Sequence, residues 1–406
     1  MKVTFKSVLV AMLAVVACGT SHDTDTPPDA PSTIVNASDV PLDGLSKDDV
    51  AKFRDGDDLF DLPFREADGL GPLYIRTACG ACHEEGSRGP GLVQKMAIVE
   101  ADGFTASPDQ SALPFGHTIR KGLEAGAVTA ITAPDVPNLK VTTRMGPPVL
   151  GRGYMEAIDD AEILRVEAEQ AARGDGIHGH VNRVTFTSVP NPDTSFSSYQ
   201  QGQTNIIGRF GLKARVATVD DFTADAFQGD MGMTTPMRPV ELPNPDGLTD
   251  DARAGVDLPL DHVDRVTFYI RRIAIPKRVG LTDRGAELFD QVQCSACHVP
   301  SMKTRTSYPI PELAGIDAPV YTDMLLHDMG AALADGMTDG TADSLAWRTA
   351  PLIGLRFARI YLHDGRAPSV DAAIQAHDGE AAASANAYRA LSDADRQTLL
   401  DYVGAL

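Results

Sequence analysis

The chain has 406 residues, which is enough for two or three domains of ordinary size. Apolar residues make up 43% and charged residues 23%, a composition typical of folded globular proteins and not of disordered ones. The formal net charge of −20 disfavours contact with phosphate backbones, so no nucleic-acid partner is expected. The longest apolar stretch, residues 8–17, is about half of the ~20 residues that a transmembrane helix needs, which excludes a polytopic membrane protein.

The first 17 residues are typical of a secretory signal peptide, because a short basic region precedes the apolar stretch. This segment ends in the sequence VVACG, which resembles the lipobox of bacterial lipoproteins and makes Cys18 the expected lipidated residue. Gly19 after this cysteine favours the outer membrane by analogy, so we expect the protein on the periplasmic side, held to the membrane by its lipid alone. A plain signal peptide with an incidental cysteine is the alternative. Residues 18–45, rich in Asp, Pro, Ser and Thr, are expected to form a flexible tether.

The expected elements after the tether are mostly helical. Ser46 as N-cap, with Asp49 in the first turn, predicts a helix that runs through Phe53 towards Phe60. Further along the chain, periodicity predicts a helix over 159–172, a short strand within 181–189, a loop over 186–208 and a helix after Ser392. The expected fold is mainly α, with two cytochrome-c-like modules, residues 46–130 and 276–406, on either side of a mixed central region with minor β structure, residues 131–275.

Four of the five cysteines form two Cys-x-x-Cys-His motifs, residues 79–83 and 294–298. This is the attachment pattern of c-type haem: the two thiols add across the haem vinyl groups, and the adjacent histidine meets the iron. Cys79 and Cys82 with His83, and Cys294 and Cys297 with His298, therefore predict two covalently bound haem c groups. A zinc site held by all four cysteines, or disulfides in an exported chain, would account for the cysteines but not for the two histidines.

A short internal repeat precedes the two motifs. Residues 57–61 (DDLFD) and residues 286–290 (AELFD) each lie upstream of a Cys-x-x-Cys-His, and the first copy is separated from its motif by 14 more residues than the second. The repeat indicates two related modules, although it is short. The second axial ligand of each haem is open at this point: histidine, methionine or a vacant position would each imply different chemistry.

The chain resembles the di-haem oxidoreductase family of peroxidase-like proteins, distant relatives of the bacterial di-haem cytochrome c peroxidases. The resemblance spans nearly all of residues 50–406 and is specific only as a combination. It rests on the stretches GLGPLY (69–74), GRFGLKA (208–214), GDMGMT (229–234), YTDMLLHDMG (321–330), WRTAPL (347–352) and LHDGRA (362–367).

The resemblance implies a distal ligand for the second haem. In the peroxidase relatives, a helix after the His-Asp-Gly turn supplies that ligand, usually as methionine. The corresponding helix here, residues 370–377, places His377 at the ligand position, which would give a haem held by His298 and His377. Imidazole in place of a thioether is expected to lower the reduction potential, so the electron-entry scheme of the relatives is in doubt for this chain.

For the first haem, the resemblance implies a distal glutamine and glutamate near the iron that binds peroxide. His117 stands where many relatives have glutamine, and Glu124 follows seven residues later, so both are candidate catalytic residues, with Glu124 as general acid–base. The alternatives are a solvated Glu124 and His117 as an axial ligand. Other candidates near the haems are Met231, Met233, Met237 and Met329 as ligands or core residues, Trp347 beside the second haem, and Arg348, His363 and Arg366 towards its propionates.

These observations favour a periplasmic di-haem c-type oxidoreductase with peroxidase-like activity. Electrons would enter at the C-terminal haem from a donor protein or a small redox donor, and hydrogen peroxide would react at the N-terminal haem. The alternatives are a pure electron-transfer cytochrome with two six-coordinate haems, and a haem enzyme that oxidises a partner protein or a thiol. An open distal position on the first haem separates the enzymes from the carrier.

Overall fold

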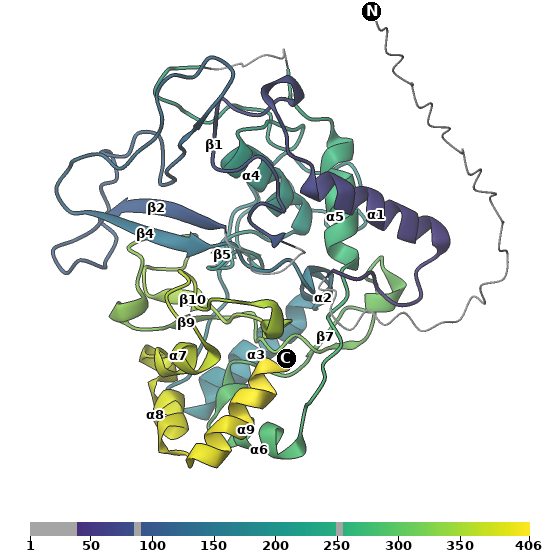
Figure 1. The fold of residues 1–406 in the computed structure, drawn as a ribbon, viewed down its shortest axis with the longest axis vertical. Helices are drawn as coiled ribbons and strands as arrows, with labels where there is room; N and C mark the ends of the chain where they lie inside the picture. The colour runs from purple at the N-terminus through teal and green to yellow at the C-terminus, as the bar shows by residue number, and fades with distance from the viewer. Residues whose placement is uncertain (1–38, 85–90, 249–254) are drawn as a thin grey trace, which may run out of the picture. The chain divides into compact units, whose positions relative to one another are not determined.

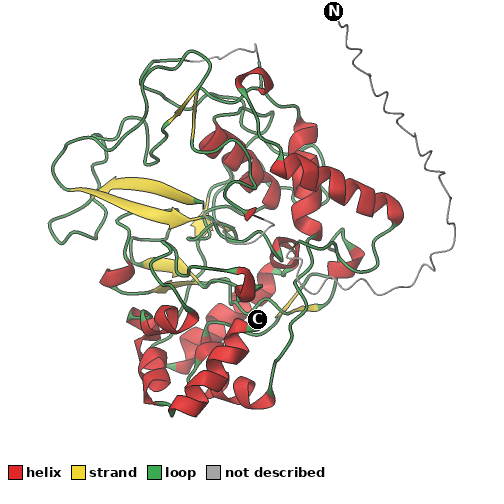
Figure 2. Cartoon of the chain, viewed as in Figure 1, coloured by secondary structure: helices red, strands yellow, loops and turns green. Residues whose placement is uncertain are grey.

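The computed structural model describes residues 39–84, 91–248 and 255–406 (Figure 1). Helices account for 33% and strands for 14% of the described residues, which confirms the expected mainly helical fold with a minor sheet component (Figure 2). The signal peptide, Cys18 and most of the tether lie outside the described residues. In the described part of the chain, no helix is long and apolar enough to cross a membrane.

Six of the nine α-helices in the described residues begin at a residue whose side chain caps the first turn. The helices are α1 (Lys47–Asp61), α2 (Arg152–Ala157), α3 (Asp160–Arg173), α4 (Val219–Met231), α5 (Leu260–Arg272), α6 (Asp283–Gln291), α7 (Val370–Gln375), α8 (Ala382–Ala390) and α9 (Asp393–Gly404). Ser46 accepts a hydrogen bond from the Asp49 N–H at the start of α1, and Ser392 accepts one from the Asp395 N–H at the start of α9, as predicted. The predicted helix over 159–172 is α3, with Asp159 as its cap.

The strands form only two-stranded antiparallel pairs among the described residues. The pairs are β1 (Leu73–Tyr74) with β3 (Gly122–Leu123), β2 (Leu92–Ile98) with β4 (Leu139–Met145), β5 (Arg183–Val184) with β6 (Ile206–Ile207), β7 (Met302–Lys303) with β8 (Asp317–Ala318), and β9 (Leu326–Asp328) with β10 (Ala346–Arg348). The predicted strand within 181–189 is therefore real but limited to two residues. The loop predicted over 186–208 is irregular except for β6.

Helices α1 and α5 cross closely, although they lie far apart in the sequence (Figure 1). A side chain at Gly56 would place its Cβ 2.4 Å from the Arg265 carbonyl oxygen, so only glycine allows this approach. Phe53 and Phe60 of α1 pack on the Tyr269 ring of α5, with ring centroids 4.9 and 5.3 Å apart. Helix α1 also contacts the first Cys-x-x-Cys-His motif, because the Gly80 N–H donates to the Phe60 carbonyl at 3.1 Å.

A buried ion network ties three helices together in the largest core. The Arg271 guanidinium of α5 donates to Glu156 of α2, with Nε and Oε2 2.6 Å apart, and to Asp220 of α4, with Nη2 and Oδ2 2.7 Å apart. The Tyr308 hydroxyl donates to the same glutamate at 2.9 Å. Because both carboxylates face one guanidinium, the charges are paired where water is excluded.

The C-terminal helices make a separate apolar cluster. Helix α6 packs on α9, where a Cβ at Gly285 would lie 2.6 Å from the Tyr402 Cβ. Leu288 and Phe289 of α6 and Leu399 of α9 are buried in this cluster. Helices α1 and α6 carry the two copies of the internal repeat near their C-terminal ends, so both repeats place an amphipathic helix before a Cys-x-x-Cys-His motif.

Candidate functional site

Both Cys-x-x-Cys-His motifs adopt the same backbone turn. The N–H of His83 donates to the Cys79 carbonyl at 3.0 Å, and the N–H of His298 donates to the Cys294 carbonyl at 2.9 Å. The common geometry supports a common role for the two motifs.

The four thiols are free and held in their neutral form. Burial is the main cause that raises the pKa of Cys79 to about 12, of Cys82 to about 11 and of Cys294 to about 12. Burial also raises the pKa of Cys297. Each pair therefore consists of two buried, reduced thiols, the form from which thioether bonds to a haem are made.

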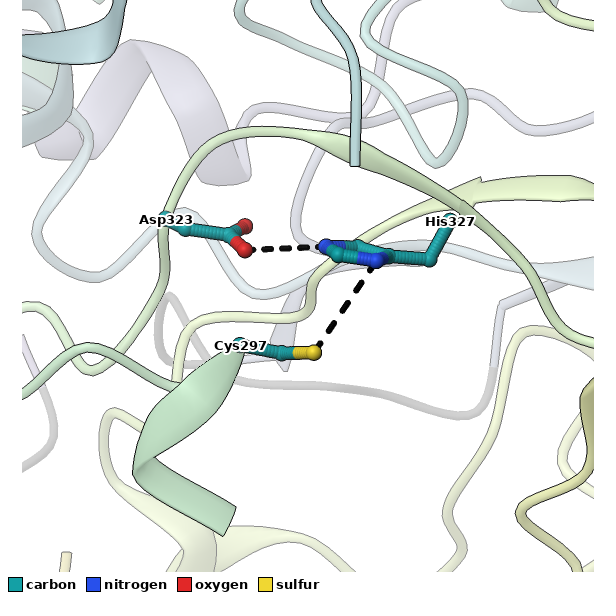
Figure 3. A group of neighbouring side chains, drawn as sticks. All are labelled: Cys297, Asp323 and His327. Atoms are coloured by element: carbon teal, nitrogen blue, oxygen red, sulfur yellow. Dashed lines mark hydrogen bonds and ion pairs between the residues drawn. The ribbon is translucent and has the colours of Figure 1, made fainter. Parts of the chain in front are cut away.

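The two cysteine pairs lie at separate sites. Among the described residues, the one group of three or more His, Cys, Asp and Glu side chains with metal-ligand spacing is Cys297, Asp323 and His327, which includes a single cysteine (Figure 3). The four-cysteine zinc site is therefore not formed by this fold.

The second site is an apolar cavity with two facing histidines. Cys294, Cys297, His298 and His377 line the cavity, together with Phe289 and other apolar side chains. The imidazoles of His298 and His377 have ring centroids 6.5 Å apart. At metal–nitrogen distances of about 2 Å, two imidazoles on opposite sides of one metal ion have ring centres roughly 6 Å apart. The structure therefore brings the two residues to a spacing that fits one iron between them.

Each of these two histidines has its Nδ1 turned to a backbone carbonyl. His298 Nδ1 lies 3.2 Å from the Tyr321 oxygen, and His377 Nδ1 lies 2.7 Å from the Ala373 oxygen one turn earlier. Because Nδ1 carries the proton in such a contact, Nε2 is left as the ligand atom in both rings. Burial lowers the pKa of His298 to about 4 and lowers the pKa of His377, so both rings are neutral, as ligands must be.

The first site has one histidine in a tight apolar setting. The His83 ring lies 6.2 Å from the Phe60 ring, and among the described residues its buried Nδ1 has no hydrogen-bond partner. A Cβ at Gly146 would lie 3.1 Å from His83 Cε1, and a Cβ at Gly91 would lie 2.4 Å from Cys82 Cβ. Burial lowers the pKa of His83 to about 4, so this ring too is a neutral potential ligand.

The candidate distal residues of the first site lie in different places. The Glu124 N–H donates to the Pro72 carbonyl at 3.1 Å, next to Gly71, whose own N–H donates to the Met231 carbonyl. Asp230, beside that methionine, is close enough to raise the pKa of both Cys79 and Cys82, after burial. These contacts connect the Glu124 backbone, through Gly71 and Met231, with the segment that contains Asp230.

His117 packs beside strand β2. Its Nδ1 lies 3.0 Å from the Met96 oxygen on β2, four residues along the strand from Leu92. Four strand residues span about 13 Å. Among the described residues, the ring contact of His83 is with Phe60 and not with His117.

The other candidates divide between the core and the second cavity. Met231, Met233 and Met237 are buried in the main core, whereas Met329 lines the second cavity. Trp347, Arg348 and His363 also line that cavity, and Arg366 lies in an adjoining surface groove beside His377. Arg348 donates through Nη1 to the Thr349 carbonyl at 2.8 Å.

Sequence reasoning missed a charged cluster at the second site. His327 lies between Asp323 and Glu380, with nitrogen–oxygen distances of 2.9 and 2.7 Å, and its Nδ1 is 3.9 Å from the Cys297 sulfur (Figure 3). Burial alone would lower the pKa of His327, but the two carboxylates hold it well above the usual range, so the ring is an imidazolium. The signal was present in the stretch 321–330, which contains both Asp323 and His327.

Comparison with known proteins gives one family match. A protein-family model described as "Di-haem oxidoreductase, putative peroxidase" matches residues 133–406, which is more than half of the chain. The second Cys-x-x-Cys-His motif lies inside the matched segment and the first lies before it. Comparison with curated proteins returned no match.

Comparison with solved structures includes hydrazine synthase of Kuenenia stuttgartiensis, in a crystal pressurised with 20 bar xenon. The alignment covers 99% of this chain and 100% of that chain, with 13% identity and a TM-score of 0.38. A TM-score at this level is no basis for inferring a shared fold.

Proposed function

Because the chain belongs to the di-haem oxidoreductase family, we propose that it is a c-type enzyme of that family in which two covalently bound haems carry out peroxidase-like chemistry. The haems supply the redox chemistry, and the protein supplies attachment, axial ligands and control of access. The observation that supports this most strongly is the pair of neutral imidazoles 6.5 Å apart in the second cavity.

The second haem would be held by the sulfurs of Cys294 and Cys297 and ligated by His298 and His377. Two strong protein ligands leave no vacant position, which favours electron transfer over substrate binding. Such a site suits the entry of electrons from a donor protein or a small redox donor. The carbonyls of Tyr321 and Ala373 would fix the two ring orientations.

The first haem would be held by Cys79 and Cys82, with His83 on its proximal side. Since His83 faces no second imidazole among the described residues, the distal position of this haem is the candidate reaction site for hydrogen peroxide. Glu124 would take up and return a proton as general acid–base, and His117 is the second candidate for that role. Transfer of electrons from the second haem to the first completes the proposed sequence.

The experiment that tests this proposal is low-temperature EPR of the fully oxidised protein, with and without hydrogen peroxide. We expect one low-spin signal from the second haem and one high-spin signal that peroxide perturbs. Two low-spin signals that ignore peroxide in both the oxidised and the half-reduced protein would instead favour an electron carrier. A peroxide-sensitive signal without steady-state peroxide turnover would favour oxidation of a partner protein or a thiol.

We also propose that the protein works on the periplasmic side of the outer membrane, anchored by a lipid on Cys18. The signal-like first 17 residues and the VVACG sequence support this proposal. Attachment of c-type haem outside the cytoplasm in bacteria agrees with an exported chain.

A further inference from the structure

His327 contacts the second Cys-x-x-Cys-His motif through Cys297 (Figure 3) and contacts Glu380, three residues after His377. The His327 side chain is 2% exposed. Its Nε2 is 2.9 Å from Asp323 Oδ2, and its Nδ1 is 2.7 Å from Glu380 Oε2. Both ring nitrogens are therefore committed to carboxylates that come from different parts of the chain.

On the Asp323 side, hydrogen bonds connect His327 with the turn of the second Cys-x-x-Cys-His motif. Asp323 Oδ2 also accepts a hydrogen bond from Gln170 Nε2 at 2.7 Å, and the same amide donates to the Ala296 carbonyl at 3.0 Å. Ala296 is the residue directly before Cys297. A Cβ at Gly179 would lie 2.5 Å from two atoms of the His327 ring, so the ring has no room to move towards that glycine.

On the Glu380 side, His327 is hydrogen-bonded to the segment that follows His377. Glu380 is three residues after His377, and its side chain is 13% exposed. Besides the imidazole, this carboxylate accepts the His178 N–H at 3.0 Å and the Asp328 N–H at 3.2 Å. A Cβ at Gly379 would lie 2.3 Å from the Asp328 carbonyl oxygen, so the backbone at Gly379 packs closely on β9.

We propose that His327 is a positioning residue which, through Glu380, holds His377 opposite His298. This inference rests on the proposed ligation of the second haem by these two histidines. The continuous series of hydrogen bonds from Ala296 to Glu380 links the attachment side of the site to the distal side. Residues that orient ligands in this way typically change metal affinity by about 10–100-fold when they are replaced.

The test is the rate at which cyanide displaces His377 in the oxidised, full-length holoprotein. The rate is followed as the replacement of the low-spin EPR signal of the haem with two histidine ligands by the different low-spin signal of its cyanide adduct. We expect Glu380→Ala to speed this loss by about tenfold or more, because His377 would leave the iron more often. Asp378→Asn is the control. Asp378 is exposed and lies two residues before Glu380, and the change also removes one negative charge. We expect its rate to stay within about twofold of the parent.

Two further variants separate the inference from the proposed ligation. If His377→Ala makes the second haem high-spin but Glu380→Ala leaves the cyanide rate unchanged, the ligation stands and the positioning role is overturned. If His377→Ala keeps the low-spin signal, both are overturned. His327→Gln is measured beside Glu380→Ala, because Glu380 also accepts the His178 and Asp328 N–H groups. A several-fold faster rate in His327→Gln supports the role of His327, and an unchanged rate overturns it.

Discussion

The indole of Trp347 stacks on the imidazole of His363, with ring centroids 3.8 Å apart and planes tilted by 17°. Both residues line the second cavity. The His363 carbonyl accepts the Met145 N–H at 2.7 Å, and the next residue, Gly146, is packed on His83. A short series of contacts thus connects the stack, which lines the second candidate site, with His83 of the first.

Trp347 is also expected to be a stabilising residue. Its Nε1 donates to the Leu333 carbonyl at 3.0 Å, and the Lys213 ammonium lies 4.0 Å from its ring centroid. Trp347→Phe keeps a ring in the stack but leaves that buried carbonyl without its donor. We expect the free energy of unfolding to fall by about 1–3 kcal/mol in urea denaturation. A change below about 0.5 kcal/mol would show that neither contact matters.

Replacing one cysteine pair at a time tests the covalent haems. The double variant Cys294→Ala, Cys297→Ala is expected to lose one of two haems in the intact mass of the denatured protein. The variant Cys79→Ala, Cys82→Ala is expected to lose the other, because each pair provides its own two sulfurs. An unchanged mass in either variant contradicts the assignment of that motif.

Glu124→Gln tests the general acid–base at the first haem. Because the amide cannot accept and return a proton, we expect peroxide turnover to fall by about 10²-fold or more while both haems remain bound. Glu100→Gln, at an exposed glutamate near the end of β2, is the control with the same change of charge. Full turnover in Glu124→Gln would transfer the role to His117, to be examined as His117→Leu.

Asp57 predicts a pH-dependent contribution to stability. Burial, and then the nearby charge of Asp39, raise the pKa of Asp57 to about 6. The folded protein therefore binds more protons than the unfolded chain between about pH 4 and pH 6, and this group's contribution to the free energy of unfolding falls as the pH rises through that range. We expect Asp57→Asn to be more stable than the parent at about pH 7, by about 1 kcal/mol for this half-buried group, and not at about pH 4.

The comparison is urea denaturation of parent and variant at both pH values. Asp58→Asn, at an exposed neighbour whose charge is a smaller cause of the raised Asp57 pKa, is expected to give a smaller gain than Asp57→Asn at about pH 7. An equal gain for Asp57→Asn at the two pH values would show that the effect does not come from ionisation.

Cys18 can be tested without reference to the described residues. Cys18→Ala removes the expected lipid attachment point, so the mature protein should move from the membrane fraction to the soluble periplasmic fraction. Ser21→Ala, three residues further on, should leave the distribution unchanged. Retention of Cys18→Ala in the membrane fraction would contradict a lipid anchor at this position.

Local signals predicted some of the helices, because caps and periodicity act over a few residues, but the sequence analysis named no helix at α4, α5 or α8. Ser46 and Ser392 begin helices as expected, and the helix after Asp159 is confirmed. The strand within 181–189 is shorter than its alternation suggested, because only residues 183 and 184 find a partner strand. The domain boundaries remain predictions.

The candidate sites were predictable only in part. The two Cys-x-x-Cys-His motifs are local in the sequence. The pairing of His298 with His377, in contrast, was predicted from the family resemblance and not from the residues alone. The hydrogen bonds around His327 connect residues from α3, β9 and the segment after α7. No spacing in the sequence indicates that these residues are in contact. Such long-range contacts depend on packing, which a single sequence does not show.

The crossing of α1 and α5 has a consequence for the order in which the protein matures. The helix that supports the first haem-attachment motif finds its packing partner only after residue 272 has been made and delivered. Helices α6 to α9, which cluster around the second motif, instead follow one another in the last part of the chain. Contacts between residues distant in sequence form late in folding. We therefore expect Cys79 and Cys82 to stay accessible to the haem-attachment machinery for longer than Cys294 and Cys297 do.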